Sequence, residues 1–461
     1  MAVASRTARI AEFASGLRYE DLPEPVVYAA KRCILDAVGC GIYGSVLPWS
    51  KTVLGTLRRL DGGGTATVWG TDHRMSAPSA TLVNGTFVHS FELDDLHKEA
   101  IIHPGGVSIP AILAAIETEA RDASGRDIVV AVVAAYEVSI RVGLATGLGL
   151  LHRGWHNNGV LGTFAAAAGV GRLLGLETAP MMDAIGMAGT QSAGLMAAQY
   201  GSAVKRMHAG RAAQSGLYAA ELAADGFRGI RNIFEAGYGG FHNTFTEEYD
   251  LDELTKGLGA VWEILQVGFK PYPACGSNHT SIDAIAALRG EHEFTPAEVI
   301  AVTVEGSTAT RDHVGWPYAP DTVTTAQMNL PYAVARALLD SSVSVASFSE
   351  EAISDPRAVA IASRVQVTAS PEIDEKGRAH RHEVRLSLKL SDGRTLTRSV
   401  VHARGSSQFP LSDEDLDRKF TDLVGNVLPG RAAELSETIR NLEALDQALT
   451  LTEQLASSPR G

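Results

Sequence analysis

The chain has 461 residues, more than the roughly 100 to 200 residues of an ordinary domain, so we expect two domains. Hydrophobic residues make up 45% of the chain and charged residues 20%, which is typical of a globular protein with a large core. The formal net charge of −13 argues against a nucleic-acid-binding surface, because phosphates require clustered Lys and Arg. A small acidic ligand needs only a local group of cations, so the net charge is compatible with one.

The cysteines and the apolar segments predict a cytoplasmic protein. Cys33, Cys40 and Cys275 have no metal-ligand spacing, and an odd number fits a reducing compartment better than a disulfide scaffold. The first ten residues lack the continuous apolar core of a signal peptide. The most apolar windows, 127–151 and 157–176, contain charged or small residues. We therefore expect them to be buried helices and predict no membrane span.

The first part of the chain has the periodicity of helices. Apolar residues recur every three or four positions from Thr7 to Val53, which predicts helices there. The run Thr65–Thr71 is typical of a short extended segment. A further helix is predicted from Ser76 to His89, where small residues permit close packing.

The segment Phe91–Pro110 follows that helix and concentrates chemically active side chains. It holds four acids, two histidines and a lysine. Ser108 and Pro110 predict the start of the next helix, because serine caps helix N-termini and proline favours the first turn. A helix N-terminus attracts anions. The segment therefore predicts a site for an acidic ligand.

The remainder of the chain divides into two parts of different character. Residues 107–265 read as helices separated by Gly and Pro. Alternating β-branched strands are predicted at 298–305, 364–368 and 382–390, with a hairpin turn at Ser391–Arg394. The expected fold is mainly α. It comprises an all-helical domain at 1–268, a smaller α+β domain at 269–402, and C-terminal helices at 403–461 that return to the helical domain.

Two polar clusters lie inside the helical part. His156 stands between Trp155 and two amides, and it could bind a carboxylate or act as an acid. Considered alone, this segment is better explained as a loop in which Asn158 caps the next helix. The other cluster is the only dense basic patch, and its four cations fit a di- or tricarboxylate; they are Lys205, Arg206, His208 and Arg211. Such runs are more often solvated surface, but the apolar surroundings favour a function here.

The segment Lys270–His279 lies where the composition changes from helical to mixed. Clefts between domains often bind ligands, and the prolines of this segment can hold Lys270, Tyr272 and His279 in fixed positions. The alternative is a hinge with incidental polar residues. Cys275 has no nearby cysteine partner and no sign of being a nucleophile.

We find no sequence pattern for a cofactor. The chain has no Walker A sequence and no strand-led Gly-x-Gly-x-x-Gly. Asp94, Asp95, His97 and His103 have the chemistry of metal ligands, but their spacing is not that of a standard metalloenzyme helix. Proton transfer is therefore favoured over metal binding, and no metal is predicted.

Five segments in order resemble the MmgE/PrpD family, over nearly the whole chain. They are Glu92–His97 with His103-Pro-Gly-Gly106, Gly154-Trp-His156, Lys205–Gly216, Lys270–Gly276 with His279, and Asn329–Ala335. The family includes 2-methylcitrate dehydratases, cis-aconitate decarboxylases and iminodisuccinate epimerases. The resemblance implies a large all-helical domain built from both ends of the chain and a smaller α+β lid. It also implies a homodimer that needs no metal or other cofactor.

The resemblance also implies which residues form the active site. The positions that match are Asp94 or Asp95, His103, His156, Lys205 and His279, with Glu92 and Tyr332 as neighbours. Many relatives have threonine where Leu96 stands here, which removes one hydrogen bond to the substrate. Gln327-Met-Asn also differs from the commoner Lys-Phe-Ser before Leu-Pro-Tyr.

The expected chemistry is proton transfer next to a carboxylate. His103 would be the base or acid, with Asp94 or Asp95 fixing its tautomer. His156 and His279 would be the opposing acid or a carboxylate ligand, while Lys205, with Arg206 or Arg211, would hold substrate carboxylates.

We therefore predict a hydro-lyase that acts on a small di- or tricarboxylic acid such as 2-methylcitrate. The first alternative is an epimerase or decarboxylase that acts on iminodisuccinate or cis-aconitate. The second is a non-catalytic carboxylate-binding protein on the same fold.

Overall fold

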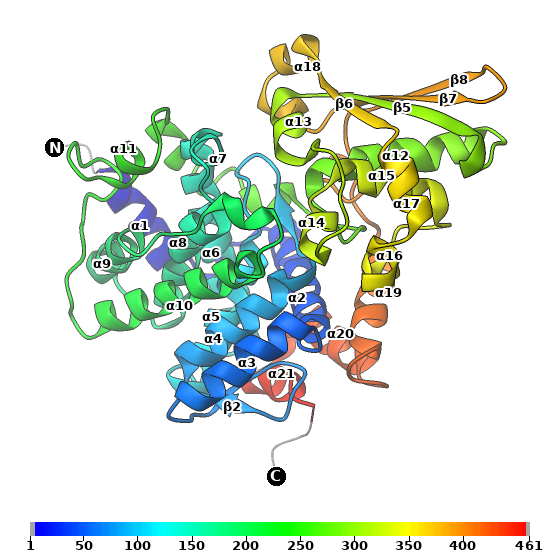
Figure 1. The fold of residues 1–461 in the computed structure, drawn as a ribbon. Helices are drawn as coiled ribbons and strands as arrows, with labels where there is room; N and C mark the ends of the chain where they lie inside the picture. Colours follow the sequence, from blue (N-terminus) through cyan, green and yellow to red (C-terminus); the bar gives the residue numbers. More distant parts are fainter. Residues whose placement is uncertain (1–4, 458–461) are drawn as a thin grey trace. The chain divides into compact units, whose positions relative to one another are not determined.

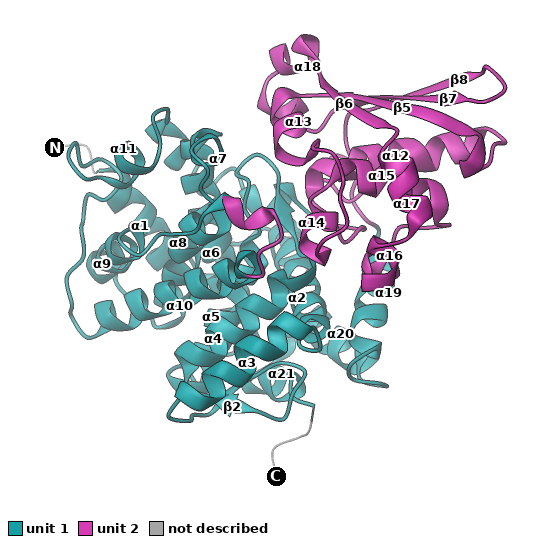
Figure 2. Cartoon of the chain, viewed as in Figure 1, with its two compact units in different colours: residues 1–196, 204–268, 412–461 teal, residues 197–203, 269–411 magenta. Residues whose placement is uncertain are grey.

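A computed structural model of the protein describes residues 5–457, so the first four residues of the N-terminal segment lie outside it. The chain forms two compact units. Figure 2 shows the first, which comprises residues 1–196, 204–268 and 412–461, and the second, which comprises residues 197–203 and 269–411. The second unit thus ends beyond the expected residue 402, because the loop up to Leu411 belongs to it.

The first unit is built from helices, as its periodicity predicts. They are α1 (Arg6–Gly16), α2 (Glu24–Gly44), α3 (Pro48–Leu60), α4 (Ala77–Val88), α5 (Pro104–Thr118), α6 (Gly125–Thr146), α7 (Gly149–His152), α8 (Asn157–Leu173), α9 (Thr178–Gly189), α10 (Val204–Ala224), α11 (Phe241–Phe245), α19 (Asp413–Gly425), α20 (Ala432–Arg440) and α21 (Leu449–Gln454). Two short strand pairs join them, β1 (Ala66–Thr67) with β2 (Arg74–Met75) and β3 (Leu96–His97) with β4 (Val267–Gly268). Figure 1 shows these helices in the colours of the sequence.

Small residues let the central helices of the first unit approach closely. Helix α10 packs on α4 and α8. A Cβ atom at Gly210 would lie 2.0 Å from the Leu82 carbonyl oxygen of α4, and one at Gly216 would lie 2.4 Å from the Thr163 carbonyl oxygen of α8. Neither position can accept a larger side chain without a backbone shift, so glycine fixes the spacing of these three helices.

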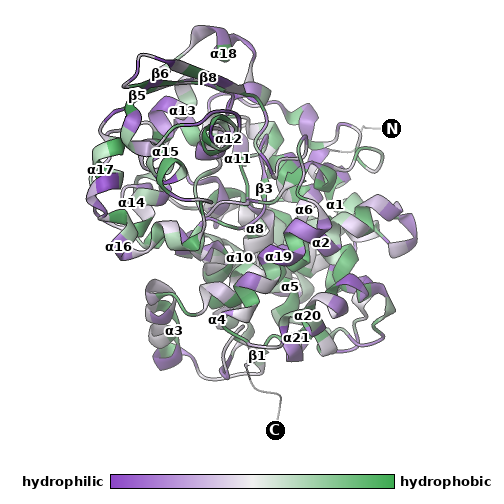
Figure 3. Cartoon of the chain, turned by 90° about the vertical axis from the view of Figure 1, so that its right-hand side faces the viewer, coloured by the Kyte–Doolittle hydropathy of each residue, from purple (hydrophilic) through white to green (hydrophobic). Residues whose placement is uncertain are grey.

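The outer helices keep a polar face. Along α3, Leu54 is buried while Lys51, Arg58 and Arg59 are exposed. Figure 3 shows the same alternation of hydrophobic and hydrophilic residues on this helix. Such an amphipathic helix buries one stripe against the core and leaves the other to solvent.

Helix α5 starts earlier than the sequence predicts. Its N-cap residue is His103, and Pro104 occupies the first helical position, where proline costs no hydrogen bond. The expected start at Ser108 and Pro110 is wrong. The Ser108 hydroxyl donates to the Pro104 carbonyl oxygen at 2.6 Å inside the helix. His103 therefore stands at the helix N-terminus itself.

Helix α6 is long and apolar enough to cross a membrane, but 94% of its most apolar window is buried within the described structure. Helices α2 and α3 are long and apolar enough only when taken together, and they are bent by 83° at the break between them. The apolar windows at 127–151 and 157–176 thus form helices α6, α7 and α8 of the first unit, and most of their residues are buried.

The second unit combines helices with a four-stranded sheet. Its strands are β5 (Val299–Gly306), β6 (Val365–Ala369), β7 (Val384–Leu390) and β8 (Thr395–Val400), in the order β6-β5-β7-β8. Strands β5 and β6 are parallel, and the other neighbours are antiparallel. The helices are α12 (Gly276–Glu291), α13 (Thr308–Val314), α14 (Val323–Gln327), α15 (Leu330–Leu339), α16 (Glu350–Ile353), α17 (Pro356–Ala362) and α18 (Pro371–Glu375).

Each strand of the predicted set is present in this sheet. Strand β7 buries every second residue, which is the period of a half-buried strand. The hairpin turn predicted at Ser391–Arg394 joins β7 to β8, and Gly393 adopts φ +92° there. Helix α12 packs against β7 and β8 and also against α15. The start of α12, which carries His279, is thereby fixed to the sheet.

Candidate active site

The loop between α4 and α5 is held in a conformation that its residues do not favour. It begins with a 3-10 turn at His89–Phe91. Glu92 and Ile101 both adopt left-handed backbone angles, with φ of 55° and 57°. This costs of the order of 1–3 kcal/mol per residue and persists only where the surroundings impose it. Strain of this kind is common at functional sites.

Asp94 lies between two histidines of this loop. Its Oδ2 atom is 2.7 Å from Nδ1 of His89, and its Oδ1 atom is 3.5 Å from Nδ1 of His103. Asp94 and His89 are fully buried, while 14% of the His103 side chain is exposed. The two imidazole rings lie 5.0 Å apart between centroids. Of the two aspartates proposed to support His103, Asp94 is the one that faces it.

Asp95 points to the other side of the loop. Its Oδ2 accepts from the Tyr136 hydroxyl at 2.7 Å, and its Oδ1 accepts from the Gly105 N–H at 3.1 Å. Burial, and secondarily the charge of Asp36, raises the pKa of Asp95 well above its usual range. Asp95 thus anchors the loop to α6 and to the first turn of α5.

The N-terminus of α8 supplies two residues beside the histidine pair. His156 is the N-cap residue of α8, so the expectation that Asn158 caps this helix is wrong. The Asn158 Oδ1 atom instead accepts from the backbone N–H of His103 at 2.9 Å, and its Nδ2 atom lies 3.3 Å from Nε2 of His89. The His156 ring lies 5.6 Å from that of His89.

His156 is also paired with His208 of α10. The two Nδ1 atoms are 2.8 Å apart, so one nitrogen donates and the other accepts. Burial is the main cause that lowers the pKa of His156 well below its usual range, and it lowers that of His208 to about 4. The positive charge of Lys205 adds to both shifts. The pair is therefore neutral near pH 7 and offers hydrogen bonds rather than charge.

Glu92 binds two cations of the basic patch. Lys205 Nζ donates to Glu92 Oε1, and Arg206 Nη1 donates to the same oxygen at 2.7 Å. All three side chains are at most 4% exposed. Two cations of α10 thus face one carboxylate in a buried group, where attraction between charges is strong because water is excluded.

The last two predicted residues of the first unit are held by other partners. His97 accepts from the Ala100 N–H at 3.1 Å, and its Nε2 lies 3.6 Å from Glu263 Oε2. Arg211 is exposed on α10 and donates to Gln214. These contacts hold His97 within the loop and keep Arg211 on the helix surface.

Four predicted residues belong to the second unit. The Tyr272 hydroxyl donates to Asp283 Oδ1 at 2.7 Å, and its ring lies 5.2 Å from that of His279. His279 Nε2 is 3.1 Å from the Ala274 carbonyl oxygen, so that nitrogen carries a proton. Tyr332 donates to the Ser347 carbonyl oxygen at 2.7 Å. Lys270 is 3% exposed. Tyr272 and His279 therefore lie together.

Sequence reasoning missed His89. It ends the helix predicted from Ser76 and stands five residues before Asp94. A histidine directly before an acidic loop is therefore the sequence feature that could have identified it. His89, Asp94 and His103 present ligand atoms within 4.8 Å of one another, and two imidazoles with one carboxylate suit several metals. The same closeness also follows from the charge of Asp94, since its Oδ2 atom is hydrogen-bonded to His89 and its Oδ1 atom faces the His103 ring.

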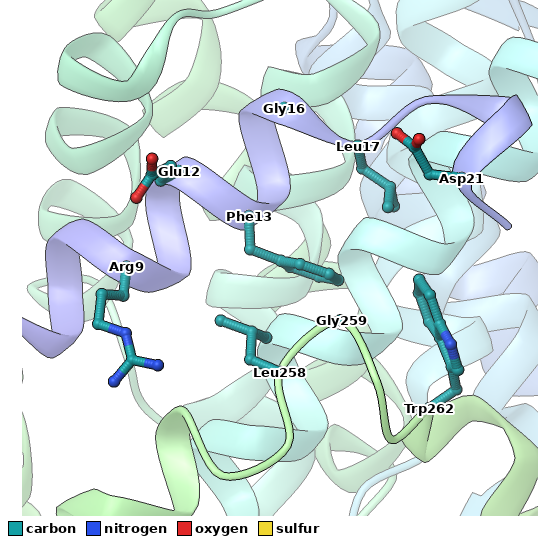
Figure 4. Close-up of a pocket in the computed structure, with 9 residues that line it drawn as sticks. All are labelled: Arg9, Glu12, Phe13, Gly16, Leu17, Asp21, Leu258, Gly259 and Trp262. Carbon is teal, nitrogen blue, oxygen red and sulfur yellow. The ribbon is translucent and has the colours of Figure 1, made fainter.

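A surface cavity of the first unit lies elsewhere. It measures about 390 Å³ and is lined by residues of α1, of the turn after it and of the segment 258–262. Figure 4 shows Phe13 and Trp262 lining it with Arg9, Glu12 and Asp21 around them. None of the predicted site residues lines this cavity, so it is separate from the histidine cluster.

Comparison with known proteins agrees with the resemblance in the motifs. The MmgE/PrpD N-terminal domain matches residues 8–253, and the MmgE/PrpD C-terminal domain matches residues 272–444. The cis-aconitate decarboxylase of Aspergillus terreus is 32% identical over 97% of this chain and 95% of its own length. A cis-aconitate decarboxylase-like protein of Aspergillus oryzae is 33% identical over 95% and 94%. The human cis-aconitate decarboxylase is 30% identical over 99% and 95%.

Both domain models match in the expected order, and the relatives align with the chain from end to end. The cluster of histidines, Asp94 and Glu92 lies within the stretch matched by the N-terminal model. The chain therefore belongs to the MmgE/PrpD family and is an enzyme of the lyase type.

Proposed function

We propose that the protein is a cofactor-independent decarboxylase of a small unsaturated tricarboxylic acid such as cis-aconitate. The observation that carries this proposal is the similarity to three proteins named for that activity or likened to it, over at least 94% of their lengths. Decarboxylation was among the first alternatives predicted from the sequence, after the hydro-lyase. We place it first here because the similar proteins are named for decarboxylation.

The buried ion group is suited to an anionic substrate. Lys205 and Arg206 both bind the carboxylate of Glu92. A substrate carboxylate placed against this group would gain Coulomb energy in a water-poor site. The neutral His156 and His208 pair adds hydrogen-bonding atoms without adding a charge that would bind product too tightly.

His103 is suited to the proton transfer. When a carboxylate leaves as CO₂, the electron pair of the broken C–C bond stays on the substrate and must take up a proton. The adjacent unsaturated acid delocalises that pair, and an imidazolium can deliver the proton. Asp94 lies 3.5 Å from the Nδ1 atom of His103. This carboxylate would hold the Nδ1 proton, so that Nε2 exchanges the proton with the substrate.

The hydro-lyase and the epimerase use the same proton transfer and remain the second candidates. A hydro-lyase would remove a proton beside a carboxylate and protonate a leaving hydroxyl. An epimerase would remove a proton and return it on the other face. His103 with Asp94 serves each of these steps equally well, so the substrate decides between them.

Incubation with three acids separates these candidates. The purified enzyme is mixed in D₂O with cis-aconitate, 2-methylcitrate or iminodisuccinate, and each reaction is followed by NMR and by CO₂ release. We expect CO₂ and one deuterium in the product from cis-aconitate alone. Dehydration of 2-methylcitrate without CO₂ would favour the hydro-lyase. Conversion or deuterium exchange with none of the three would refute the substrate class.

Two substitutions test the assigned residues. We expect His103→Ala to lower kcat by about 100-fold or more, because general acid catalysis contributes about 10²–10⁴-fold. Lys205→Ala should abolish turnover too, while the fold survives because Arg206 still pairs with Glu92. Arg211→Ala is the matched control on the same helix and should keep turnover. Normal turnover in either site variant would refute the assignment of that residue.

The remaining expectations concern the molecule as a whole. We propose a homodimer in solution, which light scattering after gel filtration would measure. A cytoplasmic setting is proposed because the three cysteines are buried and not joined in disulfides.

We also propose that activity is independent of metal. Dialysis against a chelator should leave kcat unchanged, and a loss restored by a divalent ion would point to His89, Asp94 and His103 as its ligands.

A further inference from the structure

The surface cavity of the first unit is lined mainly by apolar side chains. It measures about 390 Å³, which is within the usual size range of small-molecule sites. Phe13 of α1 packs on Trp262, with ring centroids 6.0 Å apart, and Leu258 lines the cavity beside them. Figure 4 shows these three side chains around the space between α1 and the segment 258–262. The cavity therefore suits a ligand with an apolar or aromatic body.

The segment that forms one wall of the cavity is held firmly by helix α6. Arg141 donates to the carbonyl oxygens of Lys256 and Val261, both at 2.7 Å. Glu137 accepts from the Ile264 N–H at 2.9 Å. The side chains of Arg141 and Glu137 are at most 1% exposed. The wall is thus formed before any ligand arrives, and little ordering is needed on binding, which favours affinity.

Two glycines keep the cavity open. Gly16 and Gly259 both line it, and a Cβ atom at either position would have no other atom within 4 Å. Gly259 adopts φ +81°, so its backbone already favours glycine. Gly16 ends α1 and has no left-handed angle. A larger side chain at Gly16 would therefore reduce the free space without a clash at its Cβ atom.

Arg9 places a positive charge beside the aromatic wall. Arg9 and Phe13 are four residues apart on α1, and residues at that spacing are neighbours on a helix surface. Figure 4 shows both side chains extending from α1 toward the segment that carries Leu258. Within the described residues 5–457 Arg9 forms no ion pair, and its side chain donates to the Thr255 hydroxyl at 3.2 Å. Its other guanidinium donors are available to an anion.

The two acids that line the cavity are less well placed to bind a cation. Asp21 already accepts from Arg18 Nε and Nη2, both at 3.1 Å, so its charge is balanced. Glu12 is exposed and directly precedes Phe13, and adjacent residues of a helix do not face each other. The aromatic wall and a charged end thus coincide at Arg9, which favours an anion.

We propose that this cavity is a second binding site of the protein, for an aromatic or apolar carboxylic acid. The apolar body of the acid packs against Phe13, Leu258 and Trp262. Its carboxylate accepts from the guanidinium of Arg9, whose planar fork fits two oxygen atoms. The site is separate from the histidine cluster and does not depend on the proposed decarboxylation.

Three matched probes test the site on the full-length protein. They are 4-(trifluoromethyl)phenylacetate, its amide and 4-(trifluoromethyl)benzylamine, and their binding is followed by ¹⁹F NMR. We expect the acid to bind saturably, and the amide and the amine to bind at least about threefold more weakly, because only the acid pairs with Arg9. The Trp262 indole signal, identified by its loss in Trp262→Phe, should shift. No saturable binding of the acid, or tighter binding of the amine, would overturn the proposal.

Substitutions at the cavity locate the bound acid. Gly16→Phe should fill the free space and weaken binding at least about tenfold, since an overfilled site must distort to accept a ligand. Gly55→Phe is the matched control, because Gly55 of α3 also has open space at its Cβ position but does not line the cavity. Arg9→Glu should bind the amine in preference to the acid, and it decides the matter if Gly16→Phe does not fold. Unchanged binding of the acid in either site variant would refute the site.

A final comparison separates this cavity from the histidine cluster. Lys205→Ala removes a cation of the cluster and leaves the cavity lining intact, so it should bind the probe acid as the wild type does. An excess of cis-aconitate should not displace the probe. Loss of binding in Lys205→Ala, or displacement by cis-aconitate, would place the probe in the cluster and refute a second site. If none of the three candidate substrates is turned over, the proposed function fails, yet probe binding still decides the cavity.

Discussion

Two segments that carry predicted site residues are held in different ways. The loop 89–103 of the first unit is surrounded by buried charges, with Glu92 against Lys205 and Arg206 and with Lys419 donating to the Leu93 carbonyl oxygen. In the segment 270–279 of the second unit, Tyr272 donates to the carboxylate of Asp283, and Asn278 and His279 lie within hydrogen-bond distance of backbone oxygens. Removing one partner should therefore lower the free energy of unfolding more in the first segment, because a buried charge without its partner is strongly destabilising.

Lys419→Met should give the largest loss of stability. Lys419 Nζ donates to Asp36 Oδ1 at 2.6 Å and to the Leu93 carbonyl oxygen at 2.5 Å, and Asp36 is 2% exposed. Without this cation the carboxylate stays buried and unpaired. We expect the free energy of unfolding to fall by about 3–5 kcal/mol, as measured by urea denaturation. The loop 89–103 should also lose protection in hydrogen exchange, since Lys419 anchors its backbone.

The double variant Lys419→Met with Asp36→Leu separates charge from packing. It removes both members of the pair and should recover most of the loss. Lys389→Met on strand β7 is the control, because that lysine is exposed, and its effect should stay within about 0.5 kcal/mol. A single variant as stable as the wild type would show that the loop does not depend on this buried pair.

The second prediction concerns pH. His208 has a pKa of about 4 in the folded protein against 6.5 as an ordinary value, chiefly through burial. Between these pH values the unfolded chain binds more protons, so the contribution of His208 is complete above about pH 6.5 and is lost as the pH falls toward 4. The pKa of His156 is lowered too, so its contribution to stability is also lost as the pH falls.

His208→Asn tests this effect directly. Its free energy of unfolding should depend less on pH than that of the wild type between pH 6.5 and 4, with a difference below about 3 kcal/mol because the side chain is only partly buried. The contribution of Asp283 of the second unit to stability should change with pH in the opposite direction. Burial raises its pKa, so its contribution weakens as the pH rises above the ordinary range of the carboxyl. Parallel pH curves for His208→Asn and the wild type would contradict the shift.

The sequence predicted those parts of the fold that follow from local periodicity. The helices of the first unit and the alternating strands β5, β6 and β7 were found because each pattern is complete within one segment. The start of α5 was misplaced. Ser108 and Pro110 are typical of a first turn, whereas His103 and Pro104 begin the helix, and Ser108 bonds within it.

The site was predictable only in its residue types. Motifs identified His103, His156 and Lys205, but their partners lie far away in the sequence. The contact of Asn158 with His103 spans 55 residues, and that of Lys205 with Glu92 spans 113. No local pattern reports such pairs. For this reason Asn158 was assigned as a helix cap, His89 was overlooked and the choice between Asp94 and Asp95 stayed open.

Of these variants, Tyr272→Phe should lower the free energy of unfolding least, and it therefore tests the difference between the two segments. The hydroxyl donates to Asp283 Oδ1, and the other oxygen of that carboxylate still accepts from the Arg404 N–H at 2.7 Å. Since one partner remains, we expect a loss of about 1 kcal/mol. The missing hydroxyl should also make Asp283 harder to ionise, because that hydrogen bond lowers its pKa. Urea denaturation at pH 5 and 8 would measure both changes. A loss as large as that of Lys419→Met would mean that the second segment depends on buried charge as much as the first.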